Sequence, residues 1–315
     1  MGVTEQLTDT RPLDAGRRAR VAIPFILCTL IWSSTWLVIH SQLGIVPPAW
    51  SVTYRFLVAA VAMVAYARVT GARLRFTARE HGLALVYGVA QYALNYFCVY
   101  LAERTVTSGL VAVLFALLIV PNALFAWVFL KQGVSRAFLL GSGVATIGLV
   151  LLFAHELAAV PHLRGAIWTG IGWSLLGVLF SSIANVAQAS KAARAVPVAA
   201  LIAWGMVWGV LFDAVSAWAM DGPPAFDPHP DYWVGVLYLG LIGSALAFTC
   251  YFYVIRAIGP GRAAYTSVLS PGLAMGLSTL FEGYRWSPEA IVGCLLSLAG
   301  LFVALQARQS AKPLR

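Results

Sequence analysis

Long apolar segments are the feature that most restricts what this chain can fold into. Ten of them follow one another, each bounded by charges, prolines or glycines. A helix needs about 20 mostly apolar residues to cross the hydrocarbon core of a bilayer, and we therefore predict that each segment crosses a membrane. The ten segments are residues 21–40, 49–68, 82–101, 107–130, 136–154, 166–187, 197–218, 233–253, 262–282 and 287–307.

The composition and the pattern of these segments indicate helices in lipid. Only 10% of the residues are charged, whereas a soluble domain carries about 25%. Backbone groups in lipid must be hydrogen-bonded within the protein, which leaves helices or a closed barrel. The apolar runs are continuous and lack the alternation of barrel strands. The sequence thus predicts an all-α polytopic membrane protein with ten transmembrane helices.

Lysine and arginine are distributed unequally between the two sides of the predicted bundle. Seventeen of the 21 lie in the first tail (1–20), the last tail (308–315) and the connections on the same side. Cytoplasmic loops carry an excess of these residues in membrane proteins. We therefore expect both tails to be cytoplasmic and the protein to lie in the inner, cytoplasmic membrane.

The chain reads as a duplication. The run SGLVAVLFALLIVP ends at Pro121, and IGPGRAAYTSVLSP ends at Pro271, 150 residues later in the numbering. Each half, 21–154 and 166–307, holds five predicted spans. Because five is odd, the halves would insert with opposite orientation, which is the inverted-repeat plan of secondary carriers.

Polar side chains recur at corresponding places in the two halves. The run TLIWSSTWLV (29–38) places three hydroxyls between two tryptophans, and FSS (180–182) occupies the matching place in the second half. Polar groups in hydrocarbon cost free energy unless they are paired. They either line a shared cavity or join helices, where such bonds contribute about 0.6 kcal/mol on average. The residues we predict to bind substrate are Trp32, Ser34, Trp36, Tyr92, Asn95, Tyr96, Ser181 and Asn185.

Two charged residues lie inside predicted spans. Arg55 could attract a carboxylate, hold a gate closed, or extend as an anchor to the outer interface of the membrane, because intramembrane arginines mark functional sites by default. Asp213 could pair with Arg55 or take a proton, and Glu282 is a second candidate for proton coupling. Facilitated diffusion without coupling remains open. We assign Arg55 and Asp213 gating or structural roles.

Prolines and glycines indicate where helices bend or approach one another. Pro121 and Pro271 lie in mid-span, where proline removes a backbone hydrogen bond, and we predict paired kinks with a gating or structural role. The GxxxG motif, which allows close helix packing, occurs at 205–209 and 272–276.

The sequence resembles the drug/metabolite transporter superfamily, in its EamA-type branch. The resemblance covers residues 20–307 and rests on WSSTW (32–36), VPPAWSVTYRF (46–56) and SGLVAVLF…P (108–121). It implies a ten-helix, inverted-repeat carrier of small metabolites, often an exporter of amino acids or related compounds. The family usually has Gly-Glu at the cytoplasmic end of the fourth span. This chain has Lys131-Gln132 there, and the ninth span keeps Glu282.

The function expected is secondary transport of small polar metabolites by alternating access, with export of amino acids or related compounds as the first expectation. A facilitator for nucleosides, sugars or other drug-like metabolites is the alternative. An intramembrane enzyme or a sensor is more remote, because Ser181 has no histidine in any span as its base. We predict no catalytic residue, cofactor or metal. The expected partners are a small-molecule substrate and the lipid bilayer, but not nucleic acid, because the basic residues are scattered singly.

Overall fold

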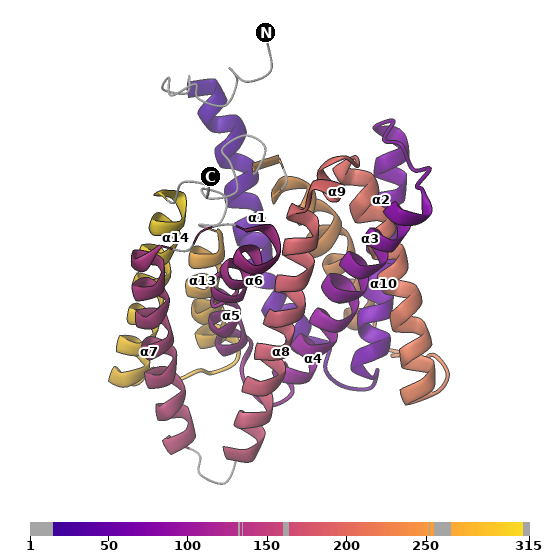
Figure 1. Cartoon of the computed structure of the whole chain (residues 1–315). Helices are drawn as coiled ribbons and strands as arrows, with labels where there is room; N and C mark the ends of the chain where they lie inside the picture. The colour runs from indigo at the N-terminus through magenta and orange to yellow at the C-terminus, as the bar shows by residue number, and fades with distance from the viewer. Residues whose placement is uncertain are drawn as a thin grey trace.

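The computed structural model describes residues 15–131, 133, 135–159, 164–251, 253–254 and 266–310. Helices and their connections make up this part of the chain, and no strand occurs in it, which confirms the all-α prediction (Figure 1). Eight helices within it are long and apolar enough to cross a membrane, and they coincide with the first eight predicted spans. Two shorter apolar helices follow, Leu269–Phe281 and Pro288–Ala304. The ninth predicted span begins outside the described residues, so the count of ten stays a prediction.

The described elements follow the predicted spans in order. They are α1 (Ala15–Ser41), α2 (Pro48–Val69), α3 (Ala78–Gly88), η2 (Val89–Leu94), α4 (Asn95–Glu103), α5 (Ser108–Ala116), α6 (Ile119–Leu130), α7 (Arg136–Ala159), α8 (Arg164–Ala189), α9 (Lys191–Arg194), α10 (Val198–Asp221), α11 (Pro230–Leu237), η4 (Tyr238–Leu246), α13 (Thr266–Phe281) and α14 (Pro288–Ser310). The third span therefore comprises α3, η2 and α4. The eighth comprises α11, η4 and the helical residues 247–251.

Local sequence explains several helix boundaries. Pro48 and Pro230 occupy the first helical positions of α2 and α11, where the missing N–H of proline has no cost. Thr77 begins α3 with a capping box, in which Thr77 and Glu80 each bond to the backbone of the other. Gly222 ends α10 with a positive φ of 79°, which glycine adopts without strain.

The third and eighth spans each contain a π-helical segment, and the two segments lie at corresponding places in the two halves. The segment η2 follows α3 in the first half, and η4 follows α11 in the second. Short π-helical segments in α-helices often occur at functional sites. Such a segment changes the direction of the side chains that follow it, and Asn95 directly follows η2.

The fourth span is broken between α5 and α6, at Leu117 and Leu118. The pyrrolidine ring of Pro121 clashes with the carbonyl four residues earlier, at Leu117, and Pro121 has no N–H to donate to it. Leu117 and Leu118 instead donate their N–H groups three residues back, at 3.0 Å each. The fourth span is thus interrupted one turn before Pro121, whereas the predicted gating or structural role of this proline stays a prediction. Pro271 differs, because α13 runs through it without interruption.

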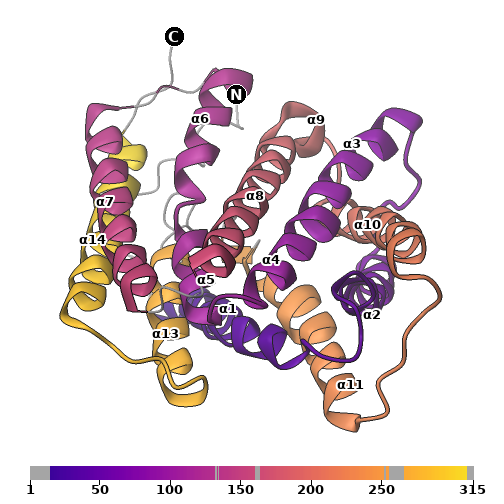
Figure 2. The same ribbon diagram turned by 90° about the horizontal axis from the view of Figure 1, so that it is seen from below.

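The fifth and tenth spans, α7 and α14, pack in antiparallel contact at one edge of the molecule (Figures 1 and 2). Gly148 lies against Gly293, and Gly141 lies against Gly300. The matching segments ATIGLVLL (145–152) and SLAGLFVA (297–304) relate Gly148 to Gly300, and the same offset relates Gly141 to Gly293. Exchanging the halves therefore turns each glycine contact into the other, as expected of two inverted repeats.

The two GxxxG motifs, both in the second half of the chain, differ in how closely they pack. Residues 205 and 209 of α10 lie directly against Tyr87, Gly88 and Tyr92 of the third span, which confirms the predicted close approach. Gly276 of α13 has no described atom within 4 Å of an added Cβ, and Gly272 has only a Leu298 methyl at 3.9 Å. The prediction of close packing at 272–276 is therefore wrong for the described part of the chain.

Candidate functional site

The WSSTW stretch lies in the interior of the bundle and contacts both halves. Trp32 packs on Tyr251, with ring centroids 4.9 Å apart, and Trp36 packs on Phe115 at 5.2 Å. The Ser34 hydroxyl is 2.6 Å from the hydroxyl of Tyr238, the first residue of η4. The side chains of Trp32, Ser34 and Trp36 are all partly exposed. The buried Trp32 Nε1 has no hydrogen-bond partner among the described residues.

The predicted site residues of the third span differ in how deeply they are buried and in their hydrogen bonding. Tyr92 is completely buried, and its hydroxyl is 2.5 Å from that of Tyr87, so it packs within the protein core. Asn95 donates from Nδ2 to the Gln91 carbonyl at 3.3 Å, and its buried Oδ1 has no described partner. Tyr96 is partly exposed. Asn95 and Tyr96 are therefore better placed than Tyr92 to meet a ligand.

The predicted residues of α8 meet the first half of the chain. The Ser181 hydroxyl lies 3.5 Å from Gln91 Oε1, and Asn185 Nδ2 lies 3.4 Å from Asn122 Oδ1. Sequence reasoning did not select Asn122. It directly follows Pro121 at the break in the fourth span, and that position was the signal available. Amides from opposite halves thus meet in the interior, with capacity left for further hydrogen bonds.

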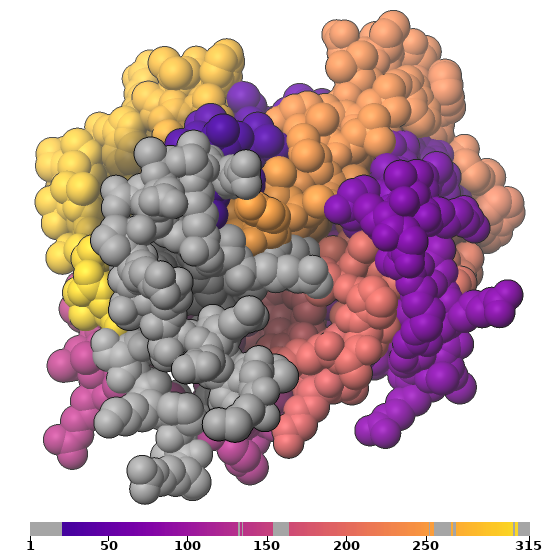
Figure 3. Space-filling model, turned by 90° about the horizontal axis from the view of Figure 1, so that it is seen from above, coloured from indigo at the N-terminus to yellow at the C-terminus, as the bar shows by residue number. Residues whose placement is uncertain are grey.

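One end of the bundle is hollowed. In the view from above (Figure 3), the surface is depressed between the salmon-coloured residues at the end of α8 and the orange residues of the eighth span. Residues 185–190 at the end of α8 are all partly exposed. The connection between α2 and α3, which carries several arginines, lies at the same end (Figure 1). We expect this end to be cytoplasmic.

Arg55 is the largest fully buried side chain in the described part of the protein. Its Nε donates to Ser244 Oγ at 3.2 Å, and its guanidinium carbon lies 4.2 Å from the ring centroid of Tyr96. The interpretation that Arg55 extends to the membrane surface is wrong, because its exposed fraction is 0%. Nη1 and Nη2 have no described hydrogen-bond partner. The side chain thus crosses from α2 to η4 and places its two Nη nitrogens in the interior, where Arg55 interacts with Tyr100.

Asp213 is buried in α10, with an exposed fraction of 5%. No ion pair joins it to Arg55 within the described part of the chain, so the predicted pairing is absent from this conformation. Asp213 Oδ2 has no described partner. Its gating or protonation role stays a prediction.

A second group of polar side chains, which we call the outer cluster, consists of Gln42, Tyr100, Glu103, Ser108 and Glu282. They lie at the end of the bundle away from the hollow (Figure 2), where α1, α4 and α13 end and α5 begins. Tyr100 donates to Gln42 Oε1 at 2.9 Å, and the Ser108 hydroxyl donates to Glu282 Oε2 at 2.9 Å. Sequence reasoning missed Glu103, because a carboxylate next to Arg104 at the end of an apolar run resembles an ordinary loop residue.

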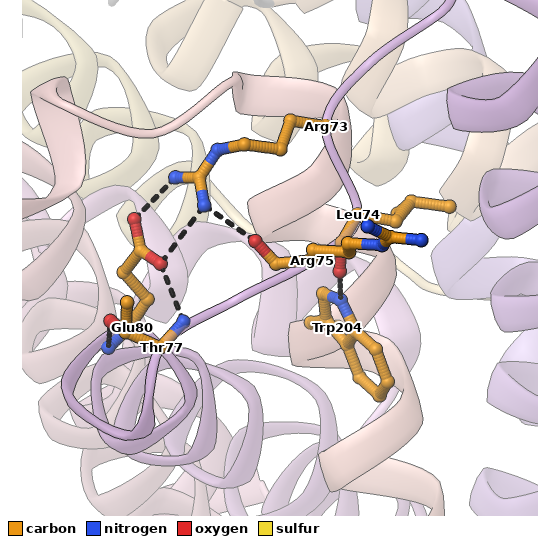
Figure 4. A network of polar contacts seen from close by, with 6 residues as sticks. All are labelled: Arg73, Leu74, Arg75, Thr77, Glu80 and Trp204. Carbon is orange, nitrogen blue, oxygen red and sulfur yellow. Dashed lines mark hydrogen bonds and ion pairs between the residues drawn. The ribbon is translucent and has the colours of Figure 1, made fainter.

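A polar network at the hollowed end fixes the connection between α2 and α3 to α10 (Figure 4). Arg73 forms an ion pair with Glu80, which also closes the cap of α3. The hydrogen bond that Arg73 donates to Glu80 raises the pKa of the Arg73 guanidinium above its ordinary value. Trp204 Nε1 donates to the Leu74 carbonyl at 2.8 Å. This network holds loop and helix together at the face expected to be cytoplasmic.

Comparisons with known proteins agree on one family. The model of the EamA-like transporter family matches this chain twice, over residues 20–154 and 168–306. Protein PagO of Salmonella typhimurium is 24% identical over 93% of this chain and 95% of its own length. The uncharacterized inner membrane transporter YedA of Escherichia coli is 26% identical over 81% of this chain and 80% of its own.

A solved structure supports the fold. A protein known by crystal structure superposes with a TM-score of 0.65 at 21% identity, covering 91% of this chain and 97% of the other. At that identity the likeness shows the fold alone. With the apolar helices of this chain and the two matches that together span most of its length, the comparisons establish that this multi-pass membrane protein belongs to the EamA-like transporter family.

Proposed function

We propose that this protein is an inner-membrane carrier that moves small polar metabolites by alternating access, exporting amino acids or related compounds. Both tails would be cytoplasmic, and the halves 21–154 and 166–307 would be inverted five-helix repeats. The relative YedA is named an inner membrane transporter. The antiparallel glycine contacts of α7 and α14 support the inverted arrangement.

The observation that carries this proposal is the meeting of polar groups from the two halves inside an otherwise apolar bundle. Ser34 of α1 reaches Tyr238 of η4, and Asn185 of α8 reaches Asn122 of α6. Each contact joins one half to the other, and the amides and hydroxyls have spare hydrogen-bonding capacity. A substrate carrying amino and carboxyl groups could exchange with these bonds, and their breaking would free the halves to move.

Trp32, Trp36 and Tyr96 would supply the apolar wall of the site. Their rings pack at centroid distances of about 5 Å on aromatic residues of other spans, in the tilted arrangements that aromatic pairs prefer. Such a wall suits the apolar part of an amino acid. The break after α5, next to Asn122, would allow α6 to tilt during the transport cycle.

Counterflow in proteoliposomes tests the proposal. Vesicles would be preloaded in turn with amino acids, nucleosides or small sugars, and uptake of the labelled compound would be followed. We expect saturable counterflow of amino acids in the wild type. Asn185→Ala and Asn122→Ala should each reduce it about tenfold, the effect of about 1.4 kcal/mol, and the double variant should lose little more. Thr169→Ala is the matched control, because Thr169 is an exposed hydroxyl residue on the same helix.

Three outcomes of the counterflow experiment would contradict the proposal or a part of it. Absence of counterflow for amino acids from a folded protein would exclude the proposed substrate class. Saturable counterflow of nucleosides or sugars alone would replace it with the alternative facilitator function. Equal counterflow in Asn185→Ala and Thr169→Ala would remove the site from the interface between the halves.

A further inference from the structure

Glu103, the last residue of α4, is a buried carboxyl group without hydrogen-bond partners. Its exposed fraction is 1%, and neither Oε1 nor Oε2 has a partner among the described residues. An ionised carboxylate in such a place loses its hydration without compensation, so buried carboxyl groups become neutral or pair with a cation. We therefore expect Glu103 either to hold a proton or to form a direct ion pair with a cation.

Glu282 is the carboxylate that faces Glu103 from the other half of the chain, and the two interact electrostatically. The carboxyl group of Glu282 accepts three hydrogen bonds. It accepts from the Ser108 hydroxyl at 2.9 Å, from the Ser278 hydroxyl at 2.5 Å and from the Ser108 backbone N–H at 3.4 Å. The hydrogen-bonding capacity of this carboxyl group is thus met by Ser108 and Ser278, whereas Glu103 receives no hydrogen bond.

Arg55 is the buried cation that interacts with Glu103. It interacts electrostatically with Glu103 and with Tyr100, which lies one turn before Glu103. His40 Nδ1 lies 3.7 Å from Glu282 Oε1, and the His40 side chain is 43% exposed. The remaining elements against α4 add no buried charge in the described part of the chain: α5 presents Ser108, α8 presents Ser174, and Arg104 and Arg164 are exposed.

Counting these charges leaves one carboxylate in excess. Arg55 compensates a single anion, and of the two acids Glu282 receives hydrogen bonds whereas Glu103 receives none. Two close carboxylates in a dry site do not both ionise, because their repulsion is hardly screened. A proton on Glu103 removes the excess while that end of the bundle is closed.

We infer that Glu103, framed by Arg55 and Glu282, is a proton-binding site that couples transport to a proton gradient. The inference rests on the proposed carrier function. Opening of the outer end would admit water to Glu103 and let the ionised carboxylate take a proton from the outer solution. Closing would bury the neutral acid, and release of this proton to the cytoplasmic side before the outer end opens again would complete one inward proton movement per cycle. A ligand that binds one conformation better than the other shifts the equilibrium between them, and here that ligand is the proton.

The first test detects the proton directly and needs no substrate. Infrared difference spectra of the protein in liposomes, taken between acidic and neutral pH, would report the carbonyl stretch of protonated carboxyl groups. We expect Glu103→Gln to lack one band that the wild type shows. Asp221→Asn, which removes an exposed acid at the end of α10, should retain it. An unchanged band in a folded Glu103→Gln protein would overturn the inference.

The second test separates coupling from transport. A mixture of labelled amino acids would be offered to vesicles with an imposed pH gradient, and net flux would be compared with counterflow at equal pH. We expect the gradient to drive net flux at least fivefold in the wild type and in Asp221→Asn. Glu103→Gln should keep counterflow but lose this response, and Glu103→Asp should recover part of it. A gradient without effect on a wild type that shows counterflow would refute coupling and leave the carrier function standing. Failed counterflow would refute the carrier function, and the infrared band would still decide whether Glu103 holds a proton.

Discussion

The antiparallel contact between α7 and α14 offers a sharp test of the packing, through the substitution Gly148→Ala. A Cβ added to Gly148 would lie 2.4 Å from the Ser297 backbone nitrogen and 2.5 Å from the Gly293 carbonyl oxygen. Both are backbone atoms, so no side chain can rotate away. Ordinary contacts of a Cβ are 3.4–4 Å, and the two helices would therefore have to separate by about 1 Å.

The expected change in the free energy of unfolding is the difference between two destabilising contributions and one stabilising contribution. Forcing an extra carbon into a packed interior costs about 1–3 kcal/mol. Separation would also strain the bond from Ser297 Oγ to the Ala145 carbonyl, now 2.8 Å, and such interhelical bonds contribute about 0.6 kcal/mol. Alanine favours a helix over glycine by roughly 1 kcal/mol. We expect a net loss of about 1–2 kcal/mol in the free energy of unfolding, by these terms.

The assay is thermal unfolding of purified protein in detergent, with Gly143→Ala as the control. Gly143 lies on the same helix, is exposed, and has no described atom within 4 Å of an added Cβ. Gly143→Ala should be neutral or slightly stabilising. Gly300→Ala should match Gly148→Ala, because the repeat relates the two positions. Equal melting temperatures for Gly148→Ala and Gly143→Ala would refute the packing, and unequal effects at 148 and 300 would refute the symmetry.

Three further substitutions probe the interior and the hollowed end. Arg55→Met removes the bond to Ser244 and the contact with an aromatic ring, which together contribute about 2–3 kcal/mol in a desolvated site, and should lower the melting temperature. Pro121→Ala restores a backbone N–H, so it should raise the melting temperature and slow counterflow by straightening the fourth span. Trp204→Phe removes the bond to the Leu74 carbonyl, worth about 1 kcal/mol, and should make residues 70–77 more susceptible to limited proteolysis.

Two of these substitutions, those of Arg55 and Trp204, have a matched control. Arg55→Lys keeps the charge and should recover only part of the lost stability, because lysine lacks the planar guanidinium. Trp168→Phe replaces a tryptophan that is 60% exposed and should not change the proteolysis. Full recovery by Arg55→Lys would contradict the role given to the stacked guanidinium, and undiminished counterflow in Pro121→Ala would contradict the role given to the break.

The sequence alone was sufficient for the helices and for the family. Hydropathy is local, so eight spans, the proline break at Pro121 and the GxxxG contact at 205–209 could be read from neighbouring residues. The duplication was also visible, because the fourth and ninth spans kept recognisable copies of one motif. The polar positions Ser34, Ser181 and Asn185 could also be recognised, because hydroxyls and amides are rare in apolar segments.

Only the tertiary structure decided which of these positions share a place and which charges are buried. Arg55, two turns into a helix, could extend to the surface or lie in the interior, and the choice depends on Ser244 and Tyr96 from other spans. Glu103 looked like a loop residue because the charged groups that interact with it, Arg55 and Glu282, are distant in sequence. Burial of a charge is a property of the assembled bundle, because it depends on how neighbouring helix ends exclude water, and a local pattern does not contain that information.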